Sequence, residues 1–166
     1  MVRMKVKVVG LDQNTLIPVV VITDMDESGF IPILIGPAEA QAISMHLDDK
    51  SKPQRPMTHD LLKNILDELD VKVERIVISD LREEIYYARV LLKTEKGTFE
   101  IDARPSDAIA LAVRADAPIY VSEEVAARAV ISNKQPDDEE MEAFRRFLDQ
   151  VNPEDFQRNL SEEGRE

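Results

Sequence analysis

The fold is decided by residues 71–115, VKVERIVISDLREEIYYARVLLKTEKGTFEIDARPSDAIALAVRA. The first part holds three runs rich in β-branched and aromatic residues, separated by turn segments at 82–84 and 95–97. This pattern predicts a three-stranded meander. The last part begins at Pro105 and mixes alanine with larger apolar residues, which predicts a helix to about Asp116. Because small side chains allow close approach, we expect this helix to pack tightly on the sheet.

The N-terminal part of the chain shows the same order of three strands and a helix. Alternating or β-branched runs at 2–11, 16–23 and 30–35 predict strands, and the first two are expected to form a hairpin. Pro37 then begins a helix that is predicted to end near Leu47. Strands that come in groups favour an α+β fold over an alternating βαβ array. We therefore predict a mixed, mostly antiparallel sheet built from strand meanders, with helices packed on it.

Two further segments have the periodicity of amphipathic helices. Thr58 is a good N-cap for a helix that ends near Leu69 and carries a stripe of leucine and isoleucine, so we predict a core helix. The composition changes at about residue 135, and an acidic helix is predicted over 137–151. These features divide the chain into a domain at residues 1–134 and an acidic helical tail at residues 135–166, packed on the domain or extending from it.

Composition excludes several function classes. The 166 residues carry a net charge of −12, which argues against a general nucleic-acid coat protein because phosphate contacts need local positive potential. The chain has no cysteine, so disulfides, thiolate zinc sites and cysteine nucleophiles are excluded. No apolar run approaches about 18 residues, and we expect a cytoplasmic protein with no membrane contact.

The first candidate site lies where a predicted strand runs into the predicted helix at Pro105. Asp102 ends the strand, and Ser106 and Asp107 stand in the first helical turn, so we expect Asp102, Arg104 and Asp107 to converge. Carboxylate oxygens suit Mg²⁺ or Mn²⁺, and an arginine at a helix start suits a phosphate. The alternative is purely structural: Ser106 or Asp107 caps the helix, and Arg104 pairs with a carboxylate.

The second candidate site is a similar phrase, Arg55-Pro56-Met57-Thr58-His59-Asp60. A histidine at a helix start can act as a general base or a metal ligand, with Asp60 beside it. Neighbouring helical positions do not face each other, so His59 and Asp60 need further geometry to reach one ion. A capped helix with a surface histidine is the structural alternative.

Three segments carry a resemblance to a known family: RPMTHDLL at 55–62, DARPSDAIALA at 102–112 and PIYV at 118–121. Together they resemble the bifunctional nuclease (BFN) domain family, with coverage from about Met4 to Phe156. The resemblance implies a compact α+β domain that forms a homo-oligomer, with a dimer favoured. It also implies nuclease activity on DNA and RNA, so nucleic acid is the expected substrate.

The family resemblance turns both phrases into signature positions but brings no catalytic mechanism with them, so the roles that follow are our own hypothesis. We expect His59, Asp60, Arg104 and Asp107 to be catalytic. In this hypothesis Asp102 and Asp107, with Asp60 or Glu39, hold a divalent cation, Mg²⁺ or Mn²⁺, and His59 activates water. The expected substrate-binding residues are Arg55, Arg104, Thr58 and Ser106.

Two other functions fit the same residues. The first is a non-enzymatic oligomeric interaction module, in which the polar residues stabilise two helix starts and an oligomer interface. The second is a small-anion or nucleotide sensor, in which the same residues bind the ligand without cleaving it. Charge placement separates these functions, because phosphodiester binding needs basic residues around one concavity. The residues to be placed are Arg55, Arg104, Arg114, Lys50, Lys52 and Lys63.

Overall fold

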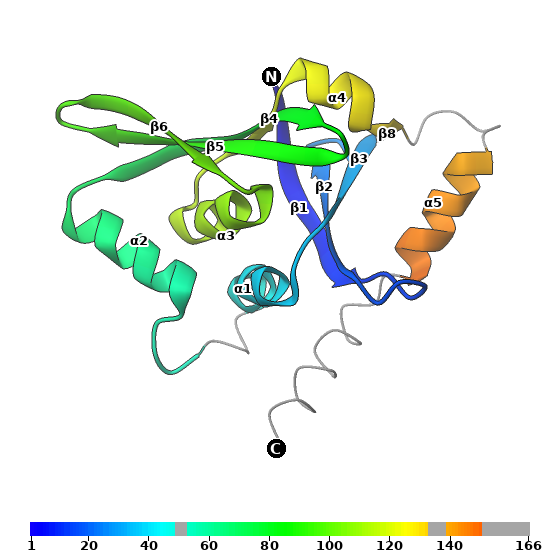
Figure 1. Cartoon of the computed structure of the whole chain (residues 1–166), viewed down its shortest axis with the longest axis horizontal. Coiled ribbons are helices and arrows are strands. Elements are labelled where there is room, and N and C mark those ends of the chain that lie inside the picture. The colour runs from blue at the N-terminus through cyan, green and yellow to red at the C-terminus, as the bar shows by residue number, and fades with distance from the viewer. Residues whose placement is uncertain (49–52, 133–138, 151–166) are drawn as a thin grey trace.

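One sheet with helices packed on it forms the protein, as the computed structural model of the chain shows for residues 1–48, 53–132 and 139–150 (Figure 1). The strands of this described part are β1 (Val2–Leu11), β2 (Pro18–Asp24), β3 (Gly29–Leu34), β4 (Lys72–Arg82), β5 (Ile85–Thr94), β6 (Gly97–Ala103), β7 (Ile119–Val121) and the two-residue β8 (Ile131–Ser132). The helices are α1 (Pro37–Leu47), α2 (Thr58–Glu68), α3 (Pro105–Ala115), α4 (Glu123–Ala129) and α5 (Glu139–Gln150).

The sheet joins two meanders. Its strand order is β6-β5-β4-β7-β1-β2-β3-β8, and strands β1 to β3 and β4 to β6 pair antiparallel with their sequence neighbours. Strand β7 lies between the meanders, parallel to β4 and antiparallel to β1. The predicted α+β class with a mixed, mostly antiparallel sheet is therefore confirmed. The two-residue strand β8, which pairs with Gly29 and Phe30 of β3, was not predicted.

The core lies between the sheet and helices α1 and α3. Helix α3 shows the close approach that its alanines predicted, because Ala108, Ile109, Ala110 and Ala112 are fully buried. They belong to one apolar cluster with α1 residues such as Ile43 and with residues of both meanders. The first turn of α3 is thereby fixed against the middle of the sheet.

Helix α5 packs on the other face of the sheet. Its Phe147 and Leu148 contact a smaller apolar cluster of Val19, Val21 and Phe30. In β2 these valines alternate with Val20 and Ile22, which belong to the main core, so the two clusters lie on opposite faces. Residues 151–166 of the predicted acidic tail lie outside the described residues, and the division at residue 135 stays a prediction.

Helix α2 corrects the prediction of a core helix. It occupies the predicted residues, but none of them is buried, and Leu61, Leu62 and Ile65 are 41–54% exposed. The apolar stripe exists as predicted, but of its residues only Leu66 packs partly against the described core. Thr58 is also not the N-cap: it is the first helical residue, and Met57 precedes it in extended conformation.

None of the described helices is both long enough and apolar enough to cross a lipid bilayer.

Candidate functional site

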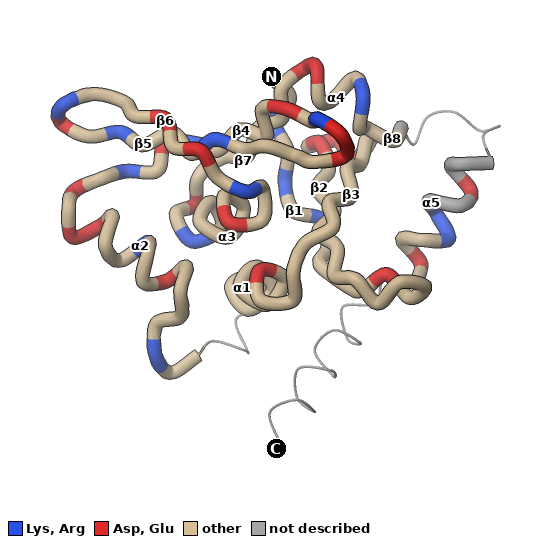
Figure 2. The backbone as a smooth tube through the Cα atoms, viewed as in Figure 1, with Lys and Arg blue, Asp and Glu red and all other residues tan. Residues whose placement is uncertain are grey.

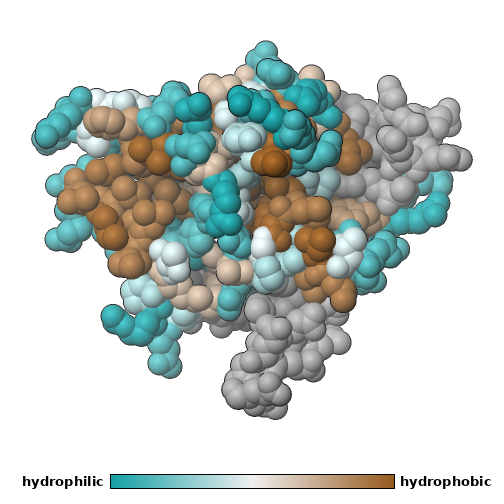
Figure 3. All heavy atoms as spheres, viewed as in Figure 1, coloured by the Kyte–Doolittle hydropathy of each residue, from teal (hydrophilic) through white to brown (hydrophobic). Residues whose placement is uncertain are grey.

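An open groove runs between α2 and the β5–β6 end of the sheet, with α3 at its base and α1 at one end. Its volume is about 760 Å³. The walls are mostly leucine, isoleucine and valine, and Figure 3 shows the apolar side chains gathered over this side of the molecule. Polar side chains from α1, α2 and α3 line the inner end, where these three helices begin.

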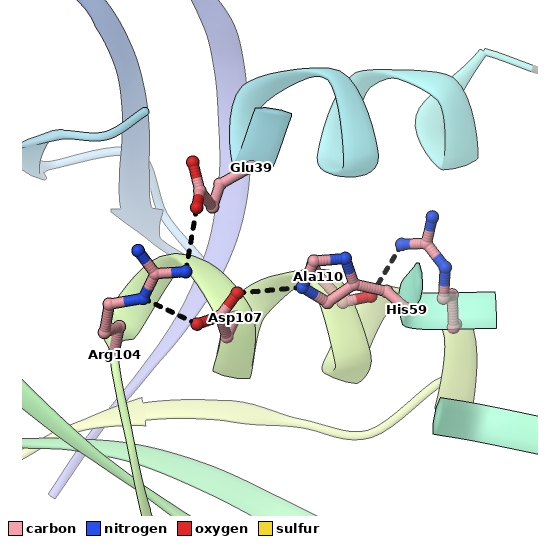
Figure 4. A network of polar contacts seen from close by, with 6 residues as sticks. Glu39, His59, Arg104, Asp107 and Ala110 are labelled. Carbon is pink, nitrogen blue, oxygen red and sulfur yellow. Dashed lines mark hydrogen bonds and ion pairs between the residues drawn. The ribbon is translucent and has the colours of Figure 1, made fainter. Parts of the chain in front are cut away.

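Four side chains form a continuous polar chain at this inner end (Figure 4). The Arg104 guanidinium donates from Nη2 to Glu39 Oε1 over 2.8 Å and from Nε to Asp107 Oδ2 over 2.7 Å. The other oxygen of Asp107, Oδ1, lies 2.9 Å from His59 Nε2. We call Glu39, Arg104, Asp107 and His59 the polar chain.

The local sequence explains why these residues meet. Arg104 is the N-cap of α3, Pro105 fixes the first helical position, and Asp107 stands in the first turn. Glu39 stands in the first turn of α1, and His59 is the second residue of α2. Free backbone N–H groups and the helix dipole stabilise negative charge at helix starts. The Asp107 carboxylate of the polar chain therefore occupies a position that favours its ionised form.

A glycine makes room for the Glu39 carboxylate. Gly36 precedes α1, and a Cβ atom added there would clash with Glu39 Oε2. Because this oxygen is the far end of a flexible side chain, a larger residue at position 36 would shift the Glu39 carboxylate and not the backbone. The backbone angles do not require glycine here, because a φ of −76° suits any residue.

The charge states in the polar chain follow from its contacts. Burial opposes ionisation of Asp107, but hydrogen bonds from Arg104 and His59 outweigh it and hold the pKa of this carboxyl below its ordinary value. An ionised Asp107 can only accept, so a neutral His59 ring carries its proton on Nε2. Its Nδ1 atom then has a free lone pair and makes no hydrogen bond with another described residue. The ring is thus held in one orientation with one nitrogen able to accept a proton.

Arg104 is the exposed member of the polar chain. Its side chain is 66% exposed, whereas those of His59 and Glu39 are 12% and 14% exposed. Hydrogen bonds to Asp107 and Glu39 raise the pKa of the guanidinium further above its ordinary value, so the group stays charged. Among the described residues, its Nη1 has no hydrogen-bond acceptor. It can therefore donate to a ligand without breaking the polar chain.

Asp60 lies outside the groove and has a structural partner. Its Oδ1 accepts from Arg114 Nε over 2.7 Å, and its Oδ2 accepts from the Met57 backbone N–H over 2.9 Å. Burial opposes its ionisation, but these hydrogen bonds prevail and lower the pKa of Asp60. The Arg114 side chain is only 6% exposed and also donates to the Ala110 carbonyl. The pair thus fixes the start of α2 on α3.

Arg114 was missed as the partner of Asp60. The sequence does indicate that Arg114 has a partner, because a basic residue in the last turn of a mostly apolar helix needs an acceptor when it is buried. The sequence does not indicate which of the many acidic residues is that acceptor, because this depends on the packing of α2 beside α3.

Asp102 lines the same groove as Arg104 and Asp107, but it does not join their hydrogen-bonded chain. It pairs with Arg89 across the β5–β6 ladder and alternates with Ile101, whose side chain shares the groove face with Val90. Its side chain therefore points to the other face of the sheet from Ile101. It makes no hydrogen bond or ion pair with a described residue.

The other predicted substrate-binding residues have different environments. Thr58 lines the groove beside His59. Ser106 is 6% exposed and does not line the groove. Arg55 is exposed and borders a separate hollow with Asp60 and Arg114. Of these three, only Thr58 is placed to touch a molecule in the groove.

The carboxylates do not form a metal-ligand set. In the part of the chain that the structure describes, no group of three His, Asp or Glu residues is arranged to hold a metal ion. Both oxygens of Asp107 are engaged by Arg104 and His59. A divalent cation at Asp107 would first have to displace the guanidinium. The predicted cation site therefore stays a prediction, and no step of the chemistry below passes through it.

Among the residues that the structure describes, basic side chains do not surround the groove. Figure 2 shows lysine and arginine spread over the molecule. Lys63 pairs with Asp67 on α2, Arg114 pairs with Asp60, and Arg55 borders the separate hollow. Lys50 and Lys52 lie outside the described residues. Of the six basic residues named above, Arg104 is the one that the described structure places at the groove, so the described residues of a single chain do not meet the charge requirement for phosphodiester binding.

A family model and several known proteins that match the chain all point to the same family. The bifunctional nuclease domain model matches residues 20–134. An uncharacterized protein from each of two Mycobacterium tuberculosis strains is 35% identical over 163 residues, which cover 92% of this chain and 97% of the relative. A rice protein named bifunctional nuclease 1 (Oryza sativa subsp. indica) is 29% identical over 85 residues, 49% of this chain and 26% of its own length.

Proposed function

This chain belongs to the bifunctional nuclease domain family, and from that premise we propose that it hydrolyses phosphodiester bonds of DNA and RNA at the inner end of the groove. The observation that carries the proposal is the polar chain: an oriented histidine and an exposed arginine share one carboxylate. The rice relative bears the name of a nuclease, which supports the same chemistry here.

His59 is the proposed general base. A water molecule at Nδ1 gives its proton to the ring, and its oxygen forms a bond to phosphorus while the bond to the leaving oxygen breaks. The leaving oxygen takes a proton from solvent. Asp107 holds the ring in the required tautomer and stabilises the imidazolium that forms, as a carboxylate behind a catalytic histidine does in other hydrolases.

Arg104 is the proposed phosphate-binding residue. Its Nη1 donors point to no described residue, and its other donors are anchored on Glu39 and Asp107, so the guanidinium is held in place before a substrate arrives. A preorganised cation stabilises the charge that develops on the phosphoryl oxygens. Thr58, at the groove wall beside His59, adds a hydroxyl donor at the same end.

Binding without cleavage is the second candidate function. It is favoured by the charges at the inner end, where Glu39 and Asp107 neutralise Arg104, and by the dispersion of the other described cations. In that case the polar chain serves to hold three helix starts together, and the groove takes an uncharged or apolar partner.

Hydrolysis of labelled single-stranded and double-stranded DNA and RNA by the purified full chain separates the two functions. We expect cleavage that falls by about 10²-fold or more in Arg104→Ala. The matched control is Arg82→Ala, because Arg82 is 69% exposed and also donates from Nε to an aspartate, Asp80, but lies away from the groove. Parallel reactions with Mg²⁺, with Mn²⁺ and with chelator test the cation prediction.

Equal cleavage by the two arginine variants would exclude the polar chain as the site and point to a contaminating nuclease. Absence of cleavage in every reaction would overturn the proposal in favour of binding alone.

A further inference from the structure

Strand β6 forms an unprotected edge of the sheet. It stands first in the strand order and pairs with β5 on one side, and no described strand pairs with its other side. Every second residue of an edge strand directs its backbone N–H and C=O away from the neighbouring strand. Six of the seven residues of β6 are exposed, so these backbone groups are open to another chain.

The usual devices that block an edge are absent from β6. Natural proteins protect edge strands with prolines, bulges, lysines or a covering segment. Strand β3, near the other end of the sheet, contains Pro32 and is partly covered by β8. Strand β6 contains neither proline nor lysine, and its register with β5 is unbroken from Gly97 to Ala103. Its edge is therefore suited to strand addition.

The side chains of β6 alternate between two chemical types. Phe99 and Ile101 point to the face of the sheet that borders the groove and are 49% and 48% exposed. Glu100 and Asp102 alternate with them and are also exposed. A strand beside β6 would thus meet apolar side chains on one face and carboxylates on the other.

Strand β5 shows which side chains β6 accepts as neighbours. On the groove face, β5 places Val90 and Leu92 opposite the two apolar residues of β6. On the other face, Arg89 lies opposite Asp102, and its Nη1 is 3.6 Å from Glu100 Oε2. Glu100 remains 57% exposed beside this arginine, and Asp102 makes no ion pair with a described residue. Both carboxylates can therefore accept a second cation.

We infer that β6 binds an extended segment of another protein by strand addition, and that apolar and basic residues alternate in this segment. In such complexes the main-chain hydrogen bonds supply affinity and the alternate side chains supply specificity. The apolar side chains of the segment lie on the groove face of the sheet. There the α2 stripe offers them a further surface, because Leu61, Leu62 and Ile65 line the groove together with Ile101 and are 41–54% exposed.

The acidic residues of β6 favour a basic partner over a second copy of this chain. Two β6 strands that pair antiparallel about Glu100 place one Glu100 opposite the other, and parallel pairing in register places every acid opposite itself. Like charges directly opposite each other destabilise a strand pair. A basic segment is also attracted from a distance by a chain with a net charge of −12.

The inference does not rest on the proposed hydrolysis. The segment is held by the backbone of β6, by its acidic residues and by apolar side chains, whereas the polar chain at the inner end of the groove is proposed to act on phosphodiesters. An inactive protein would present the same edge.

Fluorescence anisotropy of a labelled peptide tests the charge requirement. The probe is a peptide of alternating lysine and valine that has the length of β6, titrated with the purified full chain. We expect saturable binding that is weakened about tenfold or more in Glu100→Lys/Asp102→Lys, because lysines then stand opposite lysines. Both residues are exposed, so the variant should keep the native circular dichroism spectrum.

The matched control for this variant is Glu83→Lys/Glu84→Lys. It makes the same change of charge at two exposed positions in the turn between β4 and β5, outside β6. It should keep the wild-type affinity to within about twofold. Absence of binding by the wild type, or equal weakening in the two double variants, would overturn the inference.

Backbone methylation of the same peptide tests strand pairing without any change to the protein. Successive N–H groups of a strand point to opposite sides, so only one alternate set of peptide amides can face β6. We therefore expect N-methylation of either the lysine or the valine amides to abolish binding, while N-methylation of the other set preserves it. Equal affinities of the two methylated peptides, whether high or low, would contradict strand addition.

Discussion

Helices α2 and α3 begin with nearly the same Arg-Pro phrase and are both 11 residues long, yet they have opposite environments. Helix α3 buries seven of its residues, including three alanines that are fully inaccessible, whereas α2 buries none. Two polar contacts join the first turn of α2 to α3: His59 contacts Asp107 in the first turn of α3, and Asp60 contacts Arg114 in its last turn.

The difference shows that a helix-start phrase and an apolar stripe do not by themselves place a helix in the core. Helix α3 has small side chains where the sheet approaches, so burial is possible on several sides. Helix α2 has large side chains on one stripe and charged residues elsewhere, which suits a surface that meets another molecule. It is attached to the domain by the polar contacts of His59 and Asp60 at its first turn and by Leu66, which packs partly on the core.

The largest expected effect comes from truncating the buried helix. Ile109→Ala should lower the free energy of unfolding by about 2–5 kcal/mol, because it opens a cavity in the core. Ile65→Ala should cost less than about 1 kcal/mol in single chains, because that side chain is already half exposed. Urea denaturation measures both, at a dilution where light scattering detects only monomers. Similar losses for the two variants would remove the distinction between the helices.

A smaller effect is expected from breaking the polar attachment of α2. Asp60→Ala should cost about 2–3 kcal/mol, because it leaves the nearly buried Arg114 without its charged partner. Asp67→Ala on the same helix should change stability by no more than about 0.5 kcal/mol, because its ion pair with Lys63 is exposed. Thermal and urea unfolding provide the comparison. If the two losses are equal, Asp60 does not fix α2 on α3.

The smallest effect is expected in the response to acid. The pKa values of Asp60 and Asp107 lie below the ordinary value of 3.8 in the folded chain, so the unfolded chain binds more protons. The stability contributed by these carboxylates is complete above that value and is lost as the pH falls through the folded-state pKa values. The double variant Asp60→Asn/Asp107→Asn should therefore show a flatter loss of stability below pH 3.8. A slope identical to the wild-type slope would contradict this account.

Much of the fold could be predicted because it depends on local pattern. The alternation in β1, the turns at 82–84 and 95–97, and the proline that begins α3 each act within a few residues. The parallel pairing of β7 with β4 could not be predicted in the same way. It joins segments far apart in the chain, and its register depends on how both meanders pack on α1 and α3.

The site was predicted only in part for the same reason. The two phrases identified His59, Arg104 and Asp107, which do lie in contact, and strand alternation correctly separated Asp102 and Glu100 from Ile101. The sequence could not show whether Asp102 reaches the start of α3, because this depends on the angle between β6 and α3. The roles of these residues remain proposals that the substitutions above address.

The rate of phosphodiester hydrolysis by His59→Gln tests the central claim most directly. Glutamine can keep a hydrogen bond to Asp107 but cannot take a proton from water, so the fold should persist while kcat falls by about 10²–10⁴-fold. His46→Gln is the matched control, because His46 is the other histidine of the chain and stands in the last turn of α1 outside the groove. The account predicts wild-type hydrolysis by His46→Gln. It would be contradicted by wild-type hydrolysis in His59→Gln or by equal losses in both variants.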